Sequence, residues 1–148
     1  MKIIEGDLIQ LAFDGKFDVI VHQCNCFHNF GAGIALQILK QCPSAYEADR
    51  NTTIGSKSKL GTISVANVAN QFVVVNGYSQ YHCGRGKIHT EYYRVKQVFE
   101  LVKLHFSGKR IGYPLYGAGL AGGDWNIISK IIDEQLDGED HTLVKWRK

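Results

Sequence analysis

The chain has 148 residues, of which 45% are hydrophobic and 21% charged, and its formal net charge is +3 at pH 7. This length predicts a single domain over residues 1–148 with a hydrophobic core, and the small positive charge fits an anionic small ligand rather than a surface built to bind nucleic acid. The first residues lack a signal-peptide pattern and no apolar stretch reaches the roughly 20 residues of a membrane span, so we expect a cytoplasmic protein with no membrane partner and with reduced cysteines.

The first half of the chain alternates strand-like and helix-like segments. The run DVIVH is continuously apolar, which is typical of a strand buried on both faces of a sheet. A glycine-rich turn follows, then a segment with apolar residues at helical spacing, which we expect Pro43 to stop. The expected strands are residues 2–5 and 18–22, and the expected helices are residues 34–40 and 44–50.

The second half adds a pair of strands and two longer helices. Two apolar runs joined by a short polar turn predict neighbouring strands. The segment that starts at Thr90 has the clearest helical spacing, and we expect Thr90 to cap its N-terminus. The expected strands are residues 61–67, 71–77, 110–116 and 142–146, the helices are residues 90–106 and 125–136, and residues 78–89 form a surface loop.

Strands that alternate with helices predict an α/β fold with a mixed sheet and helices on both faces. Two glycine loops, GAGIA at 31–35 and GAGLAGG at 117–123, each follow a predicted strand and precede a predicted helix. Glycine lets the backbone approach a ligand, and a helix start presents unpaired N–H groups and a partial positive charge. The two loops predict one ligand with two phosphates, or a phosphate and a sugar, held from both sides. The alternative is a tightly packed turn without a ligand.

The second loop also matches the dinucleotide pattern GxGxxG at Gly117, Gly119 and Gly122. Only one helix and one strand can follow it, so the pattern argues against a Rossmann dehydrogenase. Neither glycine loop carries the Lys-Ser/Thr pair of a Walker motif, which argues against hydrolysis of nucleoside triphosphates.

His22, Cys24, Cys26 and His28 alternate at a spacing of two residues, which places them on one face of a continuous strand. Neighbours on that face are about 6.6–7 Å apart, so the four side chains span about 20 Å and do not enclose one tetrahedral zinc ion. We therefore predict buried structural thiols at Cys24 and Cys26, with no metal and no cofactor.

Several polar side chains near the loops can bind or activate a ligand. Asn25 can pair with two sugar hydroxyls, or satisfy a local backbone group in its turn. His28, His82 and His89 are acid–base candidates because imidazole titrates near neutral pH; the alternative for each is a solvated loop histidine. Asp124 can take part in catalysis or cap the following helix, and Asp7 can accept from an amino group or cap the turn after it.

With these features in place, the chain resembles the macro domain family. The likeness is carried by EGDL at 5–8, DVIVHQCNCFHNFGAGIA at 18–35 and IGYPLYGAGLAGGDW at 111–125, in the family's order and spacing. Together with the intervening elements it covers nearly the whole chain. Within the family, the chain resembles small bacterial and phage proteins that process ADP-ribose 1″-phosphate. It is also similar to relatives that remove ADP-ribose from proteins or nucleic acid.

The resemblance implies a three-layer α/β/α sandwich that binds ADP-ribose in a cleft above the sheet. Asp7 matches the acid that holds the adenine amino group, and Leu8 the residue whose backbone N–H meets the adenine ring. Asn25 matches the residue that grips the distal ribose, and Trp146 an aromatic residue that stacks on adenine. The phosphate and distal-ribose loops match two sets of residues: Gly31, Ala32, Gly33 and Ile34, then Tyr116, Gly117, Ala118, Gly119, Leu120 and Ala121.

The chain departs from the family's pattern in two places. Relatives that act through a catalytic Lys and Asp carry the Asp in the second glycine loop, where this chain has Ala121. Their Lys falls near Ser79, but no lysine occurs between Leu60 and Lys87. Many relatives also have a histidine at the position of Phe30. The missing Lys and Asp argue against the lysine–aspartate mechanism.

We expect a slow hydrolase that converts ADP-ribose 1″-phosphate to ADP-ribose and phosphate. Loop amides would hold the phosphates, Asn25 would fix the distal ribose, and His28 would activate water, with Asp124 or His89 as the next candidates. Two alternatives stay open: an ADP-ribosyl hydrolase that acts on modified protein or nucleic acid, and a non-catalytic ADP-ribose reader. We expect a monomer whose partner is ADP-ribose or its 1″-phosphate, with nucleic acid only as an ADP-ribosylated substrate.

Overall fold

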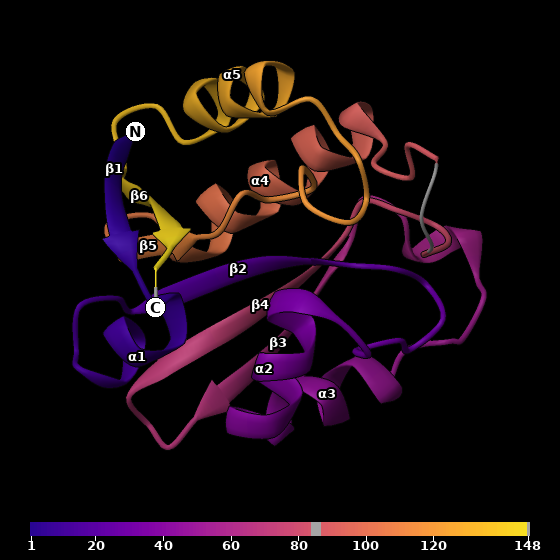
Figure 1. The fold of residues 1–148 in the computed structure, drawn as a ribbon, viewed down its shortest axis with the longest axis horizontal. Helices are drawn as coiled ribbons and strands as arrows, with labels where there is room; N and C mark the ends of the chain where they lie inside the picture. The colour runs from indigo at the N-terminus through magenta and orange to yellow at the C-terminus, as the bar shows by residue number, and fades with distance from the viewer. Residues whose placement is uncertain (84–86, 148) are drawn as a thin grey trace.

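Six strands form one sheet in the computed structural model, which describes residues 1–83 and 87–147 (Figure 1). The strand order is β1-β6-β5-β2-β4-β3, and every neighbouring pair is parallel except β3 and β4. The sheet is therefore mixed, as the sequence predicts. The strands are β1 (Lys2–Gly6), β2 (Val19–Cys24), β3 (Ile63–Val68), β4 (Phe72–Tyr78), β5 (Arg110–Tyr113) and β6 (Asp140–Trp146).

Helices cover both faces of this sheet, which confirms the three-layer α/β/α architecture. In Figure 1, α4 and α5 lie on one side of the sheet and α1, α2 and α3 on the other. The helices are α1 (Leu8–Phe13), α2 (Gly33–Gln41), α3 (Pro43–Arg50), α4 (Tyr92–Phe106) and α5 (Trp125–Gln135), with a short 3-10 helix, η1, at Lys57–Lys59. Within the residues that the structure describes, every helix is too short or too polar to cross a lipid bilayer.

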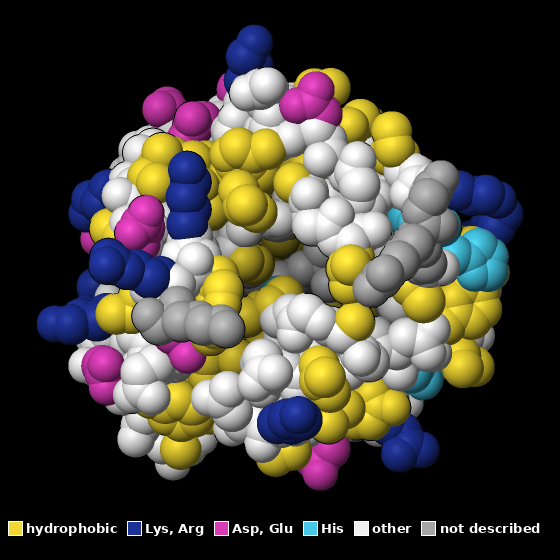
Figure 2. All heavy atoms as spheres, in the orientation of Figure 1, with side chains coloured by type: hydrophobic (Ala, Val, Ile, Leu, Met, Phe, Trp, Pro, Cys, Tyr) yellow, Lys and Arg dark blue, Asp and Glu magenta, His cyan; other side chains and the backbone are white. Residues whose placement is uncertain are grey.

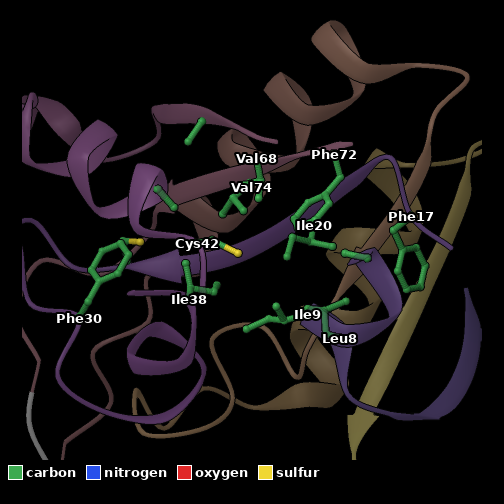
Figure 3. Packing of buried hydrophobic residues seen from close by; sticks show 14 of the residues in the cluster. Leu8, Ile9, Phe17, Ile20, Phe30, Ile38, Cys42, Val68, Phe72 and Val74 are labelled. Carbon is green, nitrogen blue, oxygen red and sulfur yellow. The ribbon is translucent and has the colours of Figure 1, made fainter. Parts of the chain in front are cut away.

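The central strand β2 supplies both halves of the core. Ile20 and Cys24 lie in the cluster formed with α1, α2 and α3, whereas Val19 and Val21 lie in the cluster formed with α4 and α5. Figure 3 shows Ile20 among the labelled side chains of the first cluster, which also include Leu8 and Ile9 of α1 and Ile38 of α2. Successive strand side chains point to opposite faces, so a continuous apolar run can only be buried in this way between two helical layers.

Three predicted element boundaries were wrong for identifiable reasons. Helix α4 begins at Tyr92 and its N-cap is Glu91, because the Thr90 hydroxyl donates instead to the carbonyl of Gly117 at 2.6 Å. Strand β5 ends at Tyr113, since Pro114 has no N–H for a ladder hydrogen bond. Pro43 follows the end of α2 but is itself the first residue of α3, a position where its missing N–H costs nothing.

His22 on β2 makes the stability of the fold depend on pH. Burial lowers the pKa of His22 from 6.5 to about 4, against a smaller upward effect of its hydrogen bond to Asn76. The unfolded chain therefore binds a proton that the folded chain does not between pH 6.5 and pH 4. The free energy of unfolding should fall by about 3 kcal/mol as the pH drops through that window.

This prediction is checked by urea denaturation at several pH values, with His22→Gln as the reference protein. Other acid-sensitive groups, such as His141, whose pKa burial also lowers, contribute to both proteins and cancel in the difference. The wild-type curve should be steeper between pH 6.5 and pH 4. Parallel curves would contradict the assignment of this effect to His22.

Candidate functional site

A cleft of about 1350 Å³ opens at the carboxyl ends of the parallel strands. Its wall includes Gly6 at the end of β1, Cys24 at the end of β2, Pro114 after β5 and Trp146 at the end of β6. Figure 2 shows this hollow near the centre of the molecular face. Parallel strands bring these four chain positions to one edge of the sheet, where open α/β sheets bind ligands.

The two glycine loops meet across this cleft. Gly31, Ala32 and Gly33 line it from one side, and Gly117, Gly119 and Leu120 from the other. A Cβ atom placed on Gly33 would lie 3.9 Å from the Leu120 side chain, so the loops are in near contact. Segments almost ninety residues apart in the chain thus face one ligand-sized space.

The first loop presents the bare N-terminus of α2. Its N-cap is Ala32, which has no side chain able to cap the helix. Within residues 1–83 and 87–147, the backbone N–H groups of Gly33, Ile34 and Ala35 have no hydrogen-bond acceptor. These N–H groups and the positive end of the helix dipole favour an anion at this point of the cleft.

The second loop is shaped by its own backbone. Gly123 donates its N–H to the carbonyl of Gly117 at 2.9 Å, and Gly122 donates to Gly119 at 3.1 Å. Gly117 adopts a φ of 70°, which favours glycine. The N–H groups of Gly119, Leu120 and Ala121 make no hydrogen bond to any described part of the chain. The loop therefore offers a second group of backbone donors to the cleft.

Asp7 and Leu8 line the far end of the cleft together with Trp146. Asp7 Oδ1 caps α1 by accepting from the N–H groups of Ile9 and Gln10, both at 3.1 Å. The capping alternative is therefore correct for one oxygen of this carboxylate. Trp146 keeps 65% of its surface exposed at the cleft rim, so its indole face is open to a flat partner.

Asn25 lines the cleft, but its side chain also builds the turn that leads to the first loop. Its Oδ1 accepts from the N–H of Phe27 at 2.8 Å, and its Nδ2 donates to the carbonyl of Asn29 at 3.3 Å. The alternative that Asn25 satisfies backbone groups in its own turn is thus present in the structure. A carbonyl-type oxygen has a second lone pair, so contact with a ligand hydroxyl is still possible at Oδ1.

His28 lines the cleft in a conformation that is uncommon for a residue other than glycine. Its φ is 60°, and its ring Nε2 lies 3.1 Å from the backbone carbonyl of Thr52. A carbonyl only accepts hydrogen bonds, so Nε2 carries the proton and the neutral ring keeps its free lone pair on Nδ1. The chemistry available to His28 is therefore that of a base at Nδ1.

Four predicted residues lie apart from the cleft lining, and one of them is the exposed His82. Asp124 is the N-cap of α5, where its Oδ1 accepts from the N–H of Asn126 at 2.8 Å, so the capping alternative is present in the structure. Ala118 does not line the cleft either, because its N–H turns back to the carbonyl of Leu115. The backbone N–H of His89 donates to the carbonyl of Ala121 in the second loop at 2.8 Å. The remaining predicted site residues all border the cleft.

A cysteine–histidine–asparagine triad is suggested by the positions of His22, Cys24 and Asn76. In such a triad the histidine must be able to take the proton of the thiol, and the hydrogen bonds here do not allow this at Nε2. Asn76 Nδ2 donates to the carbonyl of Ala45, so its Oδ1 faces His22 Nε2, 2.6 Å away, and Nε2 must carry the proton. The same Nε2 lies 3.5 Å from the Cys24 sulfur and is unable to take a proton from it, and the unprotonated Nδ1 lies farther from the sulfur, at 4.0 Å. Burial raises the pKa of Cys24 well above its usual range. Cys24 and Cys26 are buried, which confirms the prediction of structural thiols.

Four polar side chains beneath the second loop form a cluster that no pattern in the sequence indicates. Gln23 and Gln80 line the cleft, and Ser79 and Thr90 are buried next to them. Hydrogen bonds connect these side chains, for example from Gln23 Nε2 to Gln80 Oε1 at 2.9 Å. The residues lie at scattered positions on β2, after β4 and before α4, so no local sequence pattern marks them as a group.

No family model matches the chain. It is 33% identical to an uncharacterized 17.5 kDa protein in the tk-vs intergenic region of Enterobacteria phage T4, over 99% of this chain and 96% of that protein. A solved structure of a protein of unknown function from Bacteroides thetaiotaomicron is 28% identical, with a TM-score of 0.80, over 97% of this chain and 96% of that one.

More distant solved structures share the fold. The macrodomain of Thermus aquaticus DarG has a TM-score of 0.72 at 21% identity, over 99% of this chain and 97% of that one. Thermosipho africanus DarTG in complex with ADP-ribose has a TM-score of 0.73 at 17% identity, over 98% of this chain and 41% of that one.

Proposed function

We propose that the chain, which shares its fold with solved macrodomains, belongs to the macro domain family and that its cleft binds ADP-ribose. One observation carries the proposal: two sets of backbone N–H groups that have no acceptor among the described residues, at the start of α2 and in the second glycine loop, border the same cleft. A diphosphate between the two loops would accept hydrogen bonds from N–H groups on both sides. Thermosipho africanus DarTG, which shares the fold, has been solved in complex with ADP-ribose.

The remaining cleft residues suit the rest of that ligand. Asp7 has one carboxylate oxygen outside its capping bonds, which can accept from the adenine amino group, and Leu8 lies beside it. The exposed face of Trp146 can stack on the adenine ring. At the other end, Asn25 can accept from a hydroxyl of the distal ribose. We therefore orient the adenosine toward Trp146 and the distal ribose toward Asn25 and His28.

For catalysis, we propose hydrolysis of ADP-ribose 1″-phosphate, with His28 as the base. Nδ1 of His28 takes a proton from water as the water oxygen attacks phosphorus. The bond between phosphorus and the 1″ oxygen breaks, and that oxygen leaves as the 1″-hydroxyl of ADP-ribose after it takes up a proton. The first loop would stabilise charge on the phosphoryl oxygens through its N–H donors. Water and the 1″-phosphate are thus converted to ADP-ribose and inorganic phosphate.

A non-catalytic reader of ADP-ribose is the second candidate, and the composition of the cleft favours it. The acidic and imidazole groups among the described lining residues are Asp7 and His28, and Asp7 lies at the adenosine end. Asn25 is partly engaged by its own turn. A site with a single base near the distal ribose supports at most slow turnover.

Both candidate functions require that the cleft binds ADP-ribose, and calorimetric titration with ADP-ribose tests this binding. We expect binding in the micromolar range or tighter, and no heat at high micromolar concentration would reject the proposed ligand. Release of phosphate from ADP-ribose 1″-phosphate then separates the hydrolase from the reader. O-acetyl-ADP-ribose, an ADP-ribosylated peptide and ADP-ribosylated DNA complete the panel, since faster release from one of these would identify an ADP-ribosyl hydrolase instead.

A further inference from the structure

A chain of hydrogen bonds beneath the second glycine loop begins and ends on adjacent residues of that loop. The Tyr116 hydroxyl lies 2.7 Å from Ser79 Oγ, and Ser79 Oγ donates to Gln23 Oε1 at 2.6 Å. Gln23 Nε2 donates to Thr90 Oγ1 at 3.0 Å, and Thr90 Oγ1 donates to the carbonyl of Gly117 at 2.6 Å. The bonds close a ring across β2, the end of β4, the start of α4 and the base of the loop.

Two backbone carbonyls determine the direction of every bond in this ring. Gln80 Nε2 donates to the carbonyl of His82 at 2.7 Å, so Gln80 Oε1 must accept from Gln23 Nε2. Gln23 Oε1 then faces Ser79, whose only hydroxyl proton is used in that bond. The Tyr116 hydroxyl is therefore the donor to Ser79 Oγ, and burial raises the pKa of Tyr116, which keeps it protonated.

The second carbonyl is that of Gly117. Since a carbonyl only accepts hydrogen bonds, the Thr90 hydroxyl donates its proton to Gly117. A lone pair of the same hydroxyl oxygen accepts the hydrogen bond from Gln23 Nε2. The Tyr116 hydroxyl also lies 3.4 Å from the carbonyl of Gly77, but its contact with Ser79 Oγ, at 2.7 Å, is much the shorter of the two. A closed and fully satisfied network of this kind restricts its members to one geometry.

Ser79, Thr90 and Tyr116 are buried and Gln23 is half-buried, and together they leave little room for a side chain at Gly117 in the base of the loop. Ser79 is 0% exposed and Thr90 5% exposed. A Cβ atom on Gly117 would lie 3.0 Å from Thr90 Cγ2 and 3.1 Å from Gln23 Oε1. The loop base therefore rests directly on Thr90 and Gln23, at the point where its backbone turns toward the cleft.

We propose that Gln23, Ser79 and Thr90 are positioning residues that hold the second glycine loop rigid, with its N–H donors already aimed at the diphosphate. This inference rests on the proposed ADP-ribose site. It adds to that site three residues that act by holding the loop and not by contacting the ligand. Donors held in place before binding lose little freedom when the ligand arrives, so the ring raises affinity by reducing the cost of ordering the loop.

Thr90→Val is the variant that tests the ring, because it removes one hydroxyl and keeps the shape of the side chain. The carbonyl of Gly117 retains its bond from the N–H of Gly123, so the loop can still fold. We expect affinity for ADP-ribose to fall about tenfold by calorimetry, while affinity for adenosine, followed by NMR titration, changes less than about twofold, because adenosine lies away from this loop. Ser79→Ala opens the ring on its other side and should give a similar result.

Two further variants separate positioning from general destabilisation. Thr90→Ser keeps the hydroxyl and should restore ADP-ribose affinity to within about twofold of wild type. Thr62→Val removes a comparable bond, from the Thr62 hydroxyl to the carbonyl of Lys59 at 2.6 Å, outside the cleft. It should leave ADP-ribose affinity unchanged.

Backbone ¹⁵N relaxation of the ligand-free protein tests the ring without any ligand. Order parameters at Gly119, Leu120 and Ala121 should fall from about 0.85 toward about 0.6 in Thr90→Val and recover in Thr90→Ser. Unchanged order parameters would overturn the proposal, as would a mobile loop that binds ADP-ribose with wild-type affinity. Failure of the wild-type protein to bind ADP-ribose would instead reject the proposed function, and the relaxation data would still decide whether the ring holds the loop.

Discussion

Gly119→Glu should weaken ADP-ribose binding by at least 100-fold, which corresponds to about 2.7 kcal/mol. Gly119 lines the cleft beside the N–H donors of the second loop, and a Cβ atom there would lie more than 4 Å from every non-adjacent atom of the described residues. A longer side chain therefore fits without strain in the free protein. Its carboxylate would compete with the diphosphate for the same donors and repel it. Calorimetric titration measures the loss, and thermal unfolding should show a melting temperature close to that of wild type.

Gly119→Gln is the matched control for charge. It has nearly the same size as the glutamate variant, so the difference between the two isolates the electrostatic effect on an anionic ligand. We expect the glutamine variant to bind at least several-fold more tightly than the glutamate variant, and the gap to narrow at high salt. Equal and nearly wild-type affinity of both variants would mean that the diphosphate does not lie against this loop.

His28→Asn should slow phosphate release from ADP-ribose 1″-phosphate by about 100-fold or more, the usual effect of removing a general base. Asparagine tolerates a positive φ better than most residues, so the change suits the φ of 60° at this position. It removes the lone pair that the bond to the Thr52 carbonyl leaves on Nδ1. Affinity for ADP-ribose should change less than about threefold, because the base acts on water. Single-turnover phosphate release at saturating substrate measures the chemical step.

The control for this variant is His82→Asn. His82 is an exposed histidine that stacks on Phe27 with ring centroids 4.7 Å apart, and it does not line the cleft. Its replacement should leave the rate unchanged. If His28→Asn releases phosphate as fast as wild type, His28 is not the base. If the wild-type protein binds ADP-ribose but releases no phosphate, the reader is the better assignment.

The order of strands and helices was determined largely by local sequence patterns. The run at 18–22 is apolar at every position, and a strand buried between two helical layers is the structure that satisfies it, as β2 shows. The stripe of isoleucines in 125–136 predicts α5 almost to its last residue. The glycines of both loops were visible because positive φ and close approach restrict the residue type. The cleft between the loops also followed from the sequence, since parallel strands end at the same edge.

The tertiary structure alone decided how the polar side chains of the cleft are used. Asp124, Asn25 and Thr90 each had more than one possible partner in the sequence, and only packing selected the helix cap, the local turn and the Gly117 carbonyl. The protonated nitrogen of His28 depends on a carbonyl 24 residues away, and the ring through Gln23 joins residues separated by 56 and 67 positions. Periodicity and turn propensity report on neighbours along the chain. A hydrogen bond between distant side chains exists only once the sheet has brought their strands together, so no local pattern specifies it.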